Sequence, residues 1–426
     1  MAMQLTPEQQ ALYDGDQGEV KAKIMKSLVL FGETFGAEKM VPVTGKYGHL
    51  VTSFGLSFLK PVFDLVQELI DDGAVSQQAF TVDPLPIDKN VPASPLEYAV
   101  SKAIYGKQWT YNRQLEKMGL INKRGYTCTC YMDEVGNIPE KGDVLSWAES
   151  SAVVYANSVL GARCNRNSGI FELFGSVIGY VPYYGFLTDE GRKATWIVEV
   201  RTTKKPEAQL LGSVIGMKVM EDVPYVRGLD RFLGTELTGE AKDYLKDFGA
   251  ATASNGAVGL YHIENLTPEA KELGESLLAP DPQVYVIDDA ELQRVKDSYP
   301  CIWKNPDAEP ELCFLGCPHM SYRQLQDWTA RLEKALDRNG HETVQIPTVF
   351  TTSPDVLAAF QKSEDYKKLT SFGVIVSYIC PLMYMDNPLC GKKPVITSSN
   401  KLRTYTSSRF YSEDEILEKI SGGDRK

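Results

Sequence analysis

Apolar residues recur at helical spacing in two parts of the chain. In residues 59–72 they share one face of a helix, and Gly73 provides a stop. A second stripe follows Ser-Tyr-Arg-Gln at 321–324, which has the pattern of a capping box. The apolar positions are Val62, Leu65, Val66 and Leu69 in the first segment and Leu325, Trp328, Leu332 and Leu336 in the second. Both segments are predicted to be amphipathic helices that pack on a core.

Short runs of apolar, β-branched residues predict strands. Residues 372–379 read Phe-Gly-Val-Ile-Val-Ser-Tyr-Ile, and residues 284–287 read Val-Tyr-Val-Ile before two aspartates. Nearly continuous apolar runs of this length are typical of strands covered on both faces. Because such strands alternate with amphipathic helices, the sequence predicts an α/β fold with largely parallel sheets.

The length of the chain, 426 residues, indicates two or three domains. The stretch Lys-Lys-Pro at 204–206 and the loop between Pro300 and Pro310 are the best candidates for boundaries, since such residues interrupt regular structure. We expect three α/β units at about 1–205, 206–300 and 301–426.

Charge and the N-terminal sequence exclude several classes of partner. With 45 basic and 56 acidic residues the net charge is −11 and no cluster of Lys or Arg occurs, so nucleic acid is not expected to bind. Thr6 and Pro7 have the pattern of a helix N-cap and first helical position, not of a signal peptide. No apolar stretch approaches the ~18 residues that span a bilayer. We expect a cytoplasmic protein that does not enter membranes.

The eight cysteines carry the strongest chemical signal. Without export signals they are expected to be free or metal-bound rather than paired in disulfides. Three short segments stand out at 126–131 (Tyr-Thr-Cys-Thr-Cys-Tyr), 316–321 (Gly-Cys-Pro-His-Met-Ser) and 378–381 (Tyr-Ile-Cys-Pro). One thiol from each distant segment is what an iron–sulfur cluster with one open iron needs, because thiolates are its preferred ligands.

The surroundings of these cysteines bear on that hypothesis. Cys317 precedes the predicted helix start, where the helix dipole favours a thiolate, and Cys380 ends an apolar strand, at the edge where α/β proteins bind ligands. Either Cys128 or Cys130 can supply the first ligand. Two alternatives stay open: the cysteines are small buried hydrophobes, or they hold zinc with His319 as a fourth ligand, although paired Cys-x-x-Cys motifs are missing.

Residues 147–161 are predicted to form a helix with one apolar face. Its other face carries Ser150 seven residues before Asn157, and Ser151 seven before Ser158, which suits either a bound ligand or internal hydrogen bonds. Glu149 is an acid in an apolar setting, so it is expected to be paired or functional. Arg163, Asn165 and Arg166 follow at the helix end, where they can clamp an anion or neutralise the helix terminus.

Two further segments contain candidate site residues. Residues 395–401 read as a strand entering a polar turn, in which a serine near Lys401 can serve as a general base or the turn can simply be solvated. His49 follows Gly45 and Gly48 in the run Gly-Lys-Tyr-Gly-His-Leu, and glycines permit close backbone approach. His262 lies in an apolar run and is expected to be a core histidine, whereas His341 is expected in a surface loop.

Together these segments resemble the aconitase X family, in particular its large catalytic subunit. The resemblance rests on Thr-Cys-Thr-Cys-Tyr at 127–131, on the run from Trp147 to Arg166, on Gly-Cys-Pro-His-Met-Ser at 316–321, on Thr-Ser-Ser-Asn-Lys at 397–401 and on Leu-Thr-Pro-Glu-Ala at 266–270. The motifs span most of the chain in consistent order. Departures occur at Cys130, Cys164, Ser398 and Asn400, so substrate contacts near Ser399 are expected to differ from those of other members.

The resemblance implies an aconitase-like fold of three α/β domains around a central cluster cleft. It implies an iron–sulfur cluster, 4Fe–4S with 3Fe–4S or 2Fe–2S as alternatives, held by Cys128, Cys317 and Cys380. An exposed iron would bind the leaving hydroxyl while Ser399 removes a proton from carbon. We assign Ser399, Lys401 and Glu149 as catalytic candidates. Those for substrate binding are His49, Ser150, Ser151, Asn157, Arg163, Asn165, Arg166 and His319.

The resemblance also implies a hydro-lyase acting on a small anionic hydroxy acid. We expect cis-3-hydroxy-L-proline, with mevalonate 5-phosphate as the alternative substrate. A separate small subunit with a swivelling domain is expected to complete the site, because large-subunit motifs fill these 426 residues. A hypothesis of another class is an iron–sulfur-binding protein that has lost the chemistry.

Overall fold

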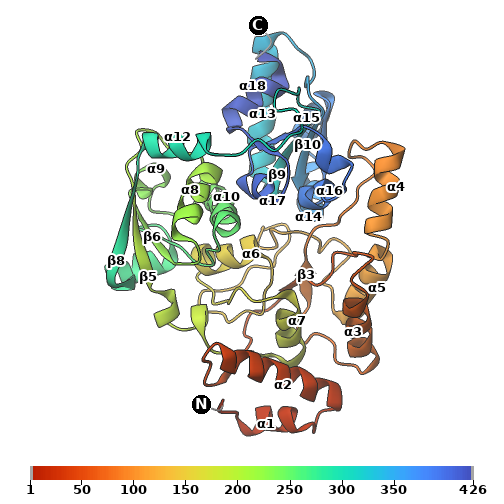
Figure 1. Ribbon diagram of the computed structural model, residues 1–426, viewed down its shortest axis with the longest axis vertical. Coiled ribbons are helices and arrows are strands. Elements are labelled where there is room, and N and C mark those ends of the chain that lie inside the picture. The colour runs from red at the N-terminus through yellow and green to blue at the C-terminus, as the bar shows by residue number, and fades with distance from the viewer. Residues whose placement is uncertain (1–2, 424–426) are drawn as a thin grey trace.

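The computed structural model describes residues 3–423, which form three α/β units around a common centre (Figure 1). The N-terminal unit lies at the bottom of the view, the second unit at the left and the C-terminal unit at the top. The predicted α/β class with parallel sheets is confirmed, since every strand pair except β1 (Met40–Pro42) with β4 (Tyr180–Pro182) runs parallel among the described residues.

The first unit is mostly helical, with two small sheets. β1 pairs with β4, and β2 (Gly48–Leu50) pairs with β3 (Phe80–Val82). Its helices are α1 (Pro7–Asp14), α2 (Glu19–Thr34), α3 (Lys60–Asp71), α4 (Pro95–Ile104), α5 (Gln108–Met118), α6 (Ser150–Tyr155) and α7 (Gly169–Ile178). Thr6 caps α1, as expected, and α3 confirms the predicted helix with Phe63, Val66 and Leu69 buried.

The second unit is built on one parallel sheet with the strand order β7-β6-β5-β8. The strands are β5 (Ala194–Val200), β6 (Pro224–Arg227), β7 (His262–Ile263) and β8 (Leu278–Ile287), and the helices are α8 (Ala208–Val219), α9 (Asp230–Leu233), α10 (Gly239–Asn255), α11 (Pro268–Leu273) and α12 (Asp289–Asp297). All partners of β5 lie in this sheet, although the expected boundary at residue 205 would leave that strand in the first unit.

The third unit contains a five-stranded parallel sheet with the order β11-β10-β9-β12-β13. The strands are β9 (Leu312–Met320), β10 (Thr348–Thr352), β11 (Val374–Ser377), β12 (Val395–Thr397) and β13 (Arg409–Phe410), and the helices are α13 (Tyr322–Asn339), α14 (Pro354–Phe360), α15 (Glu364–Ser371), α16 (Pro381–Met385), α17 (Asn400–Tyr405) and α18 (Glu413–Ser421). The capping box predicted at Ser321 is present at the start of α13, and the buried side of that helix contains all four predicted apolar positions.

Two strand predictions need correction. Residues 284–287 do form part of β8, but this strand is at the edge of its sheet, and Val284 and Val286 are 59% and 38% exposed. β11 is also an edge strand, with Ile375 and Val376 only half-buried. Apolar β-branched residues favour the strand conformation itself, so the run cannot distinguish an edge strand from a central one.

The helix predicted at 147–161 is shorter than expected and changes type. Trp147 lies beside His49 in an isolated bridge, Glu149 takes a positive φ of 81°, and α6 begins only at Ser150. Its second half, Ala156–Leu160, is a π-helical turn. Because a π turn holds an extra residue, side chains seven positions apart no longer lie on one face.

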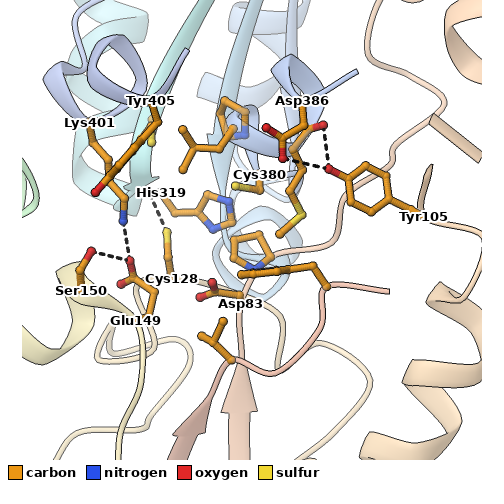
Figure 2. A pocket seen from close by; sticks show the side chains of 18 of the residues that line it. Asp83, Tyr105, Cys128, Glu149, Ser150, His319, Cys380, Asp386, Lys401 and Tyr405 are labelled. Carbon is orange, nitrogen blue, oxygen red and sulfur yellow. Dashed lines mark hydrogen bonds and ion pairs between the residues drawn. The ribbon is translucent and has the colours of Figure 1, made fainter. Parts of the chain in front are cut away.

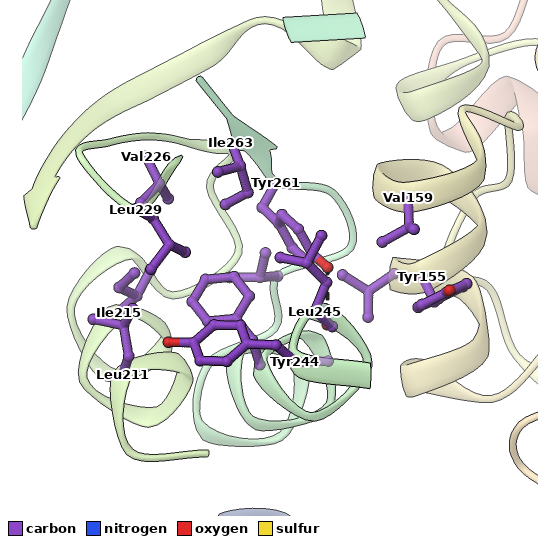
Figure 3. Packing of buried hydrophobic residues seen from close by; sticks show 14 of the residues in the cluster. Tyr155, Val159, Leu211, Ile215, Val226, Leu229, Tyr244, Leu245, Tyr261 and Ile263 are labelled. Carbon is purple, nitrogen blue, oxygen red and sulfur yellow. Dashed lines mark hydrogen bonds between the residues drawn. The ribbon is translucent and has the colours of Figure 1, made fainter. Parts of the chain in front are cut away.

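Helix α6 is the packing link between the first and second units. Tyr155 and Val159 from this segment pack towards Leu245 of α10 and Tyr261, as Figure 3 shows. Leu211 and Ile215 of α8 complete the same buried cluster, which extends to the parallel sheet. The polar end of α6 is thereby fixed relative to the second unit.

None of the described helices combines the length and apolar composition that crossing a membrane requires.

A buried ion pair joins the same two units. Arg192 donates from Nε and Nη2 to the two carboxylate oxygens of Glu269, both at 2.8 Å. Nη2 also donates to the carbonyl of Asn157 at 3.0 Å, which ties the π turn to the pair. Such a pair is costly to break because the remaining charge stays buried.

We expect Glu269→Ala to lower the free energy of unfolding by about 3 kcal/mol, because Arg192 would lose its counter-charge. Chemical denaturation followed by circular dichroism measures this. Glu272→Ala is the control: its partner Lys141 is an exposed side chain, so the change should be about 0.5 kcal/mol or less. Equal losses in the two variants would contradict the role given to the buried pair.

Candidate active site

A pocket of about 410 Å³ lies between the first and third units (Figure 2). We call it the main pocket. The first unit contributes Val51, Phe54, Leu56, Asp83, Pro84, Tyr105, Cys128, Glu149 and Ser150, and the third contributes Gly316, Cys317, His319, Cys380, Pro381, Leu382, Met383, Asp386, Lys401 and Tyr405. Its wall is largely apolar, and a few charged groups face each other across it.

Three cysteines from distant segments line this pocket. Cys128 follows the bridge between Val82 and Tyr126, Cys317 lies in β9, and Cys380 follows β11, with its N–H donating to the Leu85 carbonyl at 3.0 Å. Cys130 is fully buried elsewhere and does not line the pocket. The fold therefore brings together one thiol from each of the three segments.

Cys317 precedes the start of α13, as predicted, but it lies within β9, and residues 318–320 of that strand separate it from the N-cap Ser321. Cys380 instead is the residue at a helix start, as the N-cap of α16. Burial raises the pKa of all three thiols, Cys128, Cys317 and Cys380, so without a metal or another cation they are neutral.

An ion pair between Glu149 and Lys401 closes one side of the main pocket (Figure 2). Both side chains are over nine-tenths buried, and the Lys401 Nζ also lies 3.3 Å from the Ser151 hydroxyl. Glu149 is the N-cap of α6, where it accepts from the Ala152 N–H at 2.7 Å and from the Ser151 hydroxyl at 2.6 Å. These contacts hold its carboxylate at the pocket wall.

The pair is fully charged. Burial alone would raise the pKa of Glu149, but Lys401 and the hydroxyl and amide donors outweigh it and lower that pKa to about 2. Burial lowers the pKa of Lys401, yet the Glu149 carboxylate reverses the effect and raises it above the ordinary value. The main pocket therefore contains one ammonium that already has a counter-ion.

Asp83 is a pocket residue that the sequence analysis missed. It follows β3, and burial followed by the negative charge of Glu149 raises its pKa well above the ordinary value. Its Oδ1 lies 3.8 Å from the His49 Nε2, and neither atom has a hydrogen-bond partner among the described residues. The sequence did contain a signal for Asp83, because the strand-like run Phe-Thr-Val at 80–82 ends directly before it. Polar groups at strand ends often face ligand sites.

His49 lies behind Asp83 and not in the wall of the main pocket. Its Nδ1 is 2.9 Å from the Thr81 hydroxyl, the ring is fully buried, and burial lowers its pKa to about 4. The ring is therefore neutral near pH 7. The expected role for His49 as a direct substrate contact does not match this position.

His319 lines the main pocket, but both of its ring nitrogens are already bonded. Nε2 lies 3.1 Å from the Ile379 carbonyl and Nδ1 lies 3.1 Å from the Thr127 hydroxyl. Because a carbonyl only accepts, Nε2 donates and Nδ1 accepts. His319 thus has no nitrogen left for zinc, and within residues 3–423 no group of three His, Cys, Asp or Glu side chains is suited to hold a single metal ion.

Several expected anion-binding residues lie outside the main pocket. Asn157 uses its amide on the Cys164 and Gly259 carbonyls, Asn165 bonds to Tyr184 and Phe186, and Arg163 pairs with the Leu187 carbonyl and Asp189. Arg166 donates from Nη2 to the Ala253 carbonyl at 3.0 Å, and its buried Nη1 has no hydrogen-bond partner among the described residues. Asn157, Asn165 and Arg163 are therefore bonded to other groups of the chain, which does not match the substrate-binding role expected for them. The expected role of Arg166 stays a prediction.

The remaining candidates lie close to the ion pair. Ser150 lines the main pocket and Ser151 bridges Glu149 and Lys401. Ser399 is the N-cap of α17; its hydroxyl donates to the Cys317 carbonyl and accepts from the Leu402 N–H at 3.1 Å. It lines a small neighbouring cavity of about 30 Å³ together with Cys317, not the main pocket.

Fold and site together define a three-unit α/β protein with a thiol-lined cleft of the aconitase type. Family models match residues 2–190, 194–297 and 310–416 as the first, second and third domains of aconitase X. The chain belongs to the aconitase X family. A crystal structure described as Thermococcus kodakaraensis aconitase X, holo-form, matches with a TM-score of 0.79 at 26% identity, covering 98% of this chain and 100% of that one.

Curated relatives carry two enzyme names. The phosphomevalonate dehydratase large subunit of Thermococcus kodakarensis is 31% identical over 96% of both chains, and that of Methanocaldococcus jannaschii is 32% identical over 76% of this chain and 77% of that one. The cis-3-hydroxy-L-proline dehydratase of Pseudomonas aeruginosa is 26% identical over 93% of this chain but 65% of its own length. The prediction of an enzyme of the hydro-lyase class is confirmed.

We expect stability to fall in mild acid because three buried histidines resist protonation. The pKa values of His49, His262 and His319 are each lowered by burial to about 4, from 6.5. Between these pH values the unfolded chain binds protons that the folded chain does not, so the free energy of unfolding decreases as pH falls, by about 1.4 kcal/mol per pH unit for each histidine.

Urea denaturation from pH 6.5 to 4.5 measures this slope. His49→Gln should reduce it by about 1.4 kcal/mol per pH unit, and His262→Gln, outside the main pocket, should do the same. A slope unchanged in both variants would mean that the rings are charged in the folded protein.

Proposed function

We propose that this chain is the large subunit of an iron–sulfur-dependent dehydratase. The observation that supports it is the convergence of Cys128, Cys317 and Cys380 on one buried pocket beside the Glu149–Lys401 ion pair. Three thiolates and a cleft large enough for a small hydroxy acid are what such an enzyme requires.

The donor set fits a cluster better than a single ion. Thiolates are the ligands that iron–sulfur clusters prefer, and a cluster of several irons holds its thiolates farther apart than one ion does. Three ligands would leave one iron without a protein ligand. When bound, the cluster would supply a Lewis acid for the leaving hydroxyl. Because burial raises the pKa of these thiols, loading should release protons.

The chain's own groups have distinct proposed roles. Dehydration removes a proton from one carbon and a hydroxyl from its neighbour, which leaves as water once it is protonated. Asp83, protonated because of its raised pKa and facing the main pocket, is suited to give that proton. Lys401 stabilises negative charge that develops on the substrate. We assign removal of the carbon-bound proton to Ser399 as an alkoxide, after its own hydroxyl proton, now donated to the Cys317 carbonyl, has passed to solvent. Taking the proton from carbon restores the hydroxyl.

For the substrate we propose mevalonate 5-phosphate. The relatives named phosphomevalonate dehydratase large subunit are more similar than the hydroxyproline dehydratases, and the Thermococcus kodakarensis subunit is covered over 96% of its length. This reverses the order expected from the sequence. cis-3-Hydroxy-L-proline stays a second candidate, because the carboxylates of Glu149 and Asp386 in the main pocket can pair with its ammonium group.

We further propose a separate small subunit that completes the site. Lys401 is the single Lys or Arg among the described residues that line the main pocket, and Glu149 already neutralises it. An anionic substrate therefore needs a further cation from outside this pocket. The match to this chain covers 65% and 67% of the two hydroxyproline dehydratases. The rest of each of those proteins is long enough to contain a fused equivalent of the proposed small subunit.

Anaerobic reconstitution tests the cluster. We expect iron and acid-labile sulfide in the wild-type chain, with visible absorbance of a cluster, and a loss of most of both in Cys128→Ser, Cys317→Ser and Cys380→Ser. Cys130→Ser is the matched control, since Cys130 lies two residues from Cys128 but outside the main pocket. Full iron content in the three variants would reject this ligand set.

A substrate assay of the reconstituted two-subunit complex tests the reaction. Mevalonate 5-phosphate should be dehydrated and cis-3-hydroxy-L-proline should not; the opposite result would favour the second candidate. Ser399→Ala should lower kcat by at least about 100-fold, the usual contribution of general base catalysis. Ser398→Ala, at the neighbouring serine to which no catalytic role is assigned, should retain activity. Equal activity of the two variants would remove Ser399 as the base.

A further inference from the structure

We propose that Lys246 is a positioning residue for the three cysteines, acting through His319. This inference rests on the proposed function, because it concerns the geometry of the cluster ligands. Lys246 belongs to α10 of the second unit, which contributes no residue to the main pocket. Its influence on the site therefore depends on the contact that it makes with the third unit.

Lys246 is among the most deeply buried charges of the described chain. Its side chain is 1% exposed, and its Nζ lies 3.0 Å from the His319 carbonyl and 3.0 Å from the Asp247 Oδ1. Gln324 at the start of α13 donates to the other oxygen of Asp247 at 2.7 Å. Lysine is rarely buried unless its charge is paired and bonded, so this arrangement fixes the ammonium at one place.

His319 contacts all three cysteine segments. Its backbone N–H donates to the Cys128 Sγ at 3.5 Å, and its ring accepts from the hydroxyl of Thr127, next to Cys128. Its Nε2 donates to the carbonyl of Ile379, next to Cys380. Cys317 lies two residues earlier in the same strand. A shift of the backbone at 319 would therefore move the ligand positions relative to one another.

Lys246 donates a hydrogen bond to the backbone carbonyl of His319. The ring and the N–H of His319 are bonded to the other cysteine segments, and the ammonium of Lys246 bonds the group that remains. Groups that orient metal ligands in this way commonly change metal affinity 10- to 100-fold when they are removed. Lys246 thus links the packing of the second unit to the arrangement of the cysteines.

Iron retention tests the proposal. The reconstituted two-subunit complex is mixed anaerobically with an iron chelator, and the rate of cluster loss is followed by absorbance, with electron paramagnetic resonance of the reduced cluster as a second readout. We expect Lys246→Met to lose iron about ten times faster than wild type with an altered resonance spectrum, and Lys246→Arg to restore most of the retention. Lys242→Met is the control, because Lys242 is exposed one turn earlier on α10.

The coupling through His319 gives a second measurement. His319→Gln removes the ring contacts to Thr127 and Ile379 but keeps the backbone carbonyl that Lys246 bonds, so it should accelerate iron loss by itself. A wild-type rate of iron loss in His319→Gln would overturn the route through His319. A wild-type rate and spectrum in Lys246→Met would also overturn the proposal.

Folding is verified by circular dichroism before reconstitution. If Lys246→Met does not fold, Lys246→Gln, which keeps a shorter donor without the charge, takes its place, and a wild-type rate and spectrum in that variant overturn the proposal. A wild-type complex without iron would instead reject the proposed function. The two failures are therefore distinguishable.

Discussion

The buried ion pair of Glu149 and Lys401 is the constraint on which the site depends. Each charge is costly away from water, and each is tolerated because the other is beside it. Glu149 starts α6 in the first unit and Lys401 lies in α17 of the third, so the pair fixes the two walls of the main pocket relative to each other. The second unit enters this arrangement through α6, whose other side packs on α10.

The electrostatics of the pocket follow from burial around that pair. The negative charge of Glu149 adds to burial in raising the pKa of Asp83, so one acid is ionised and its neighbour keeps a proton. The histidines at 49 and 319 are neutral because they are buried. The protonated Asp83 and the Lys401 ammonium thus line the same cavity. A dehydration requires one group that donates a proton and one that stabilises negative charge.

The same contacts explain why residues that look functional in the sequence serve the structure. Asn157 and Arg163 are polar and lie near a site motif, yet Asn157 bonds two backbone carbonyls, and Arg163 bonds a backbone carbonyl and the Asp189 carboxylate. His319 looked like a substrate or zinc ligand, and its ring instead joins two cysteine segments. Lys246 carried no sequence signal, because its partner is a backbone carbonyl 73 positions away.

The sequence by itself determined the α/β class, the helices at 60–71 and 322–339, and the three cysteine segments, because periodicity, capping residues and thiol chemistry are local properties. It also indicated that Glu149 would be paired, since an acid in an apolar segment needs a partner. Only the tertiary structure decided which groups meet: Cys128 and not Cys130 lines the pocket, Asp83 joins it, and Asn157 leaves it. Asn157 leaves the site because the π turn changes which side chains share a helix face. Cys128 and Asp83 enter it because the ends of distant strands meet there. Both depend on contacts between residues far apart in the chain, which local sequence patterns do not report.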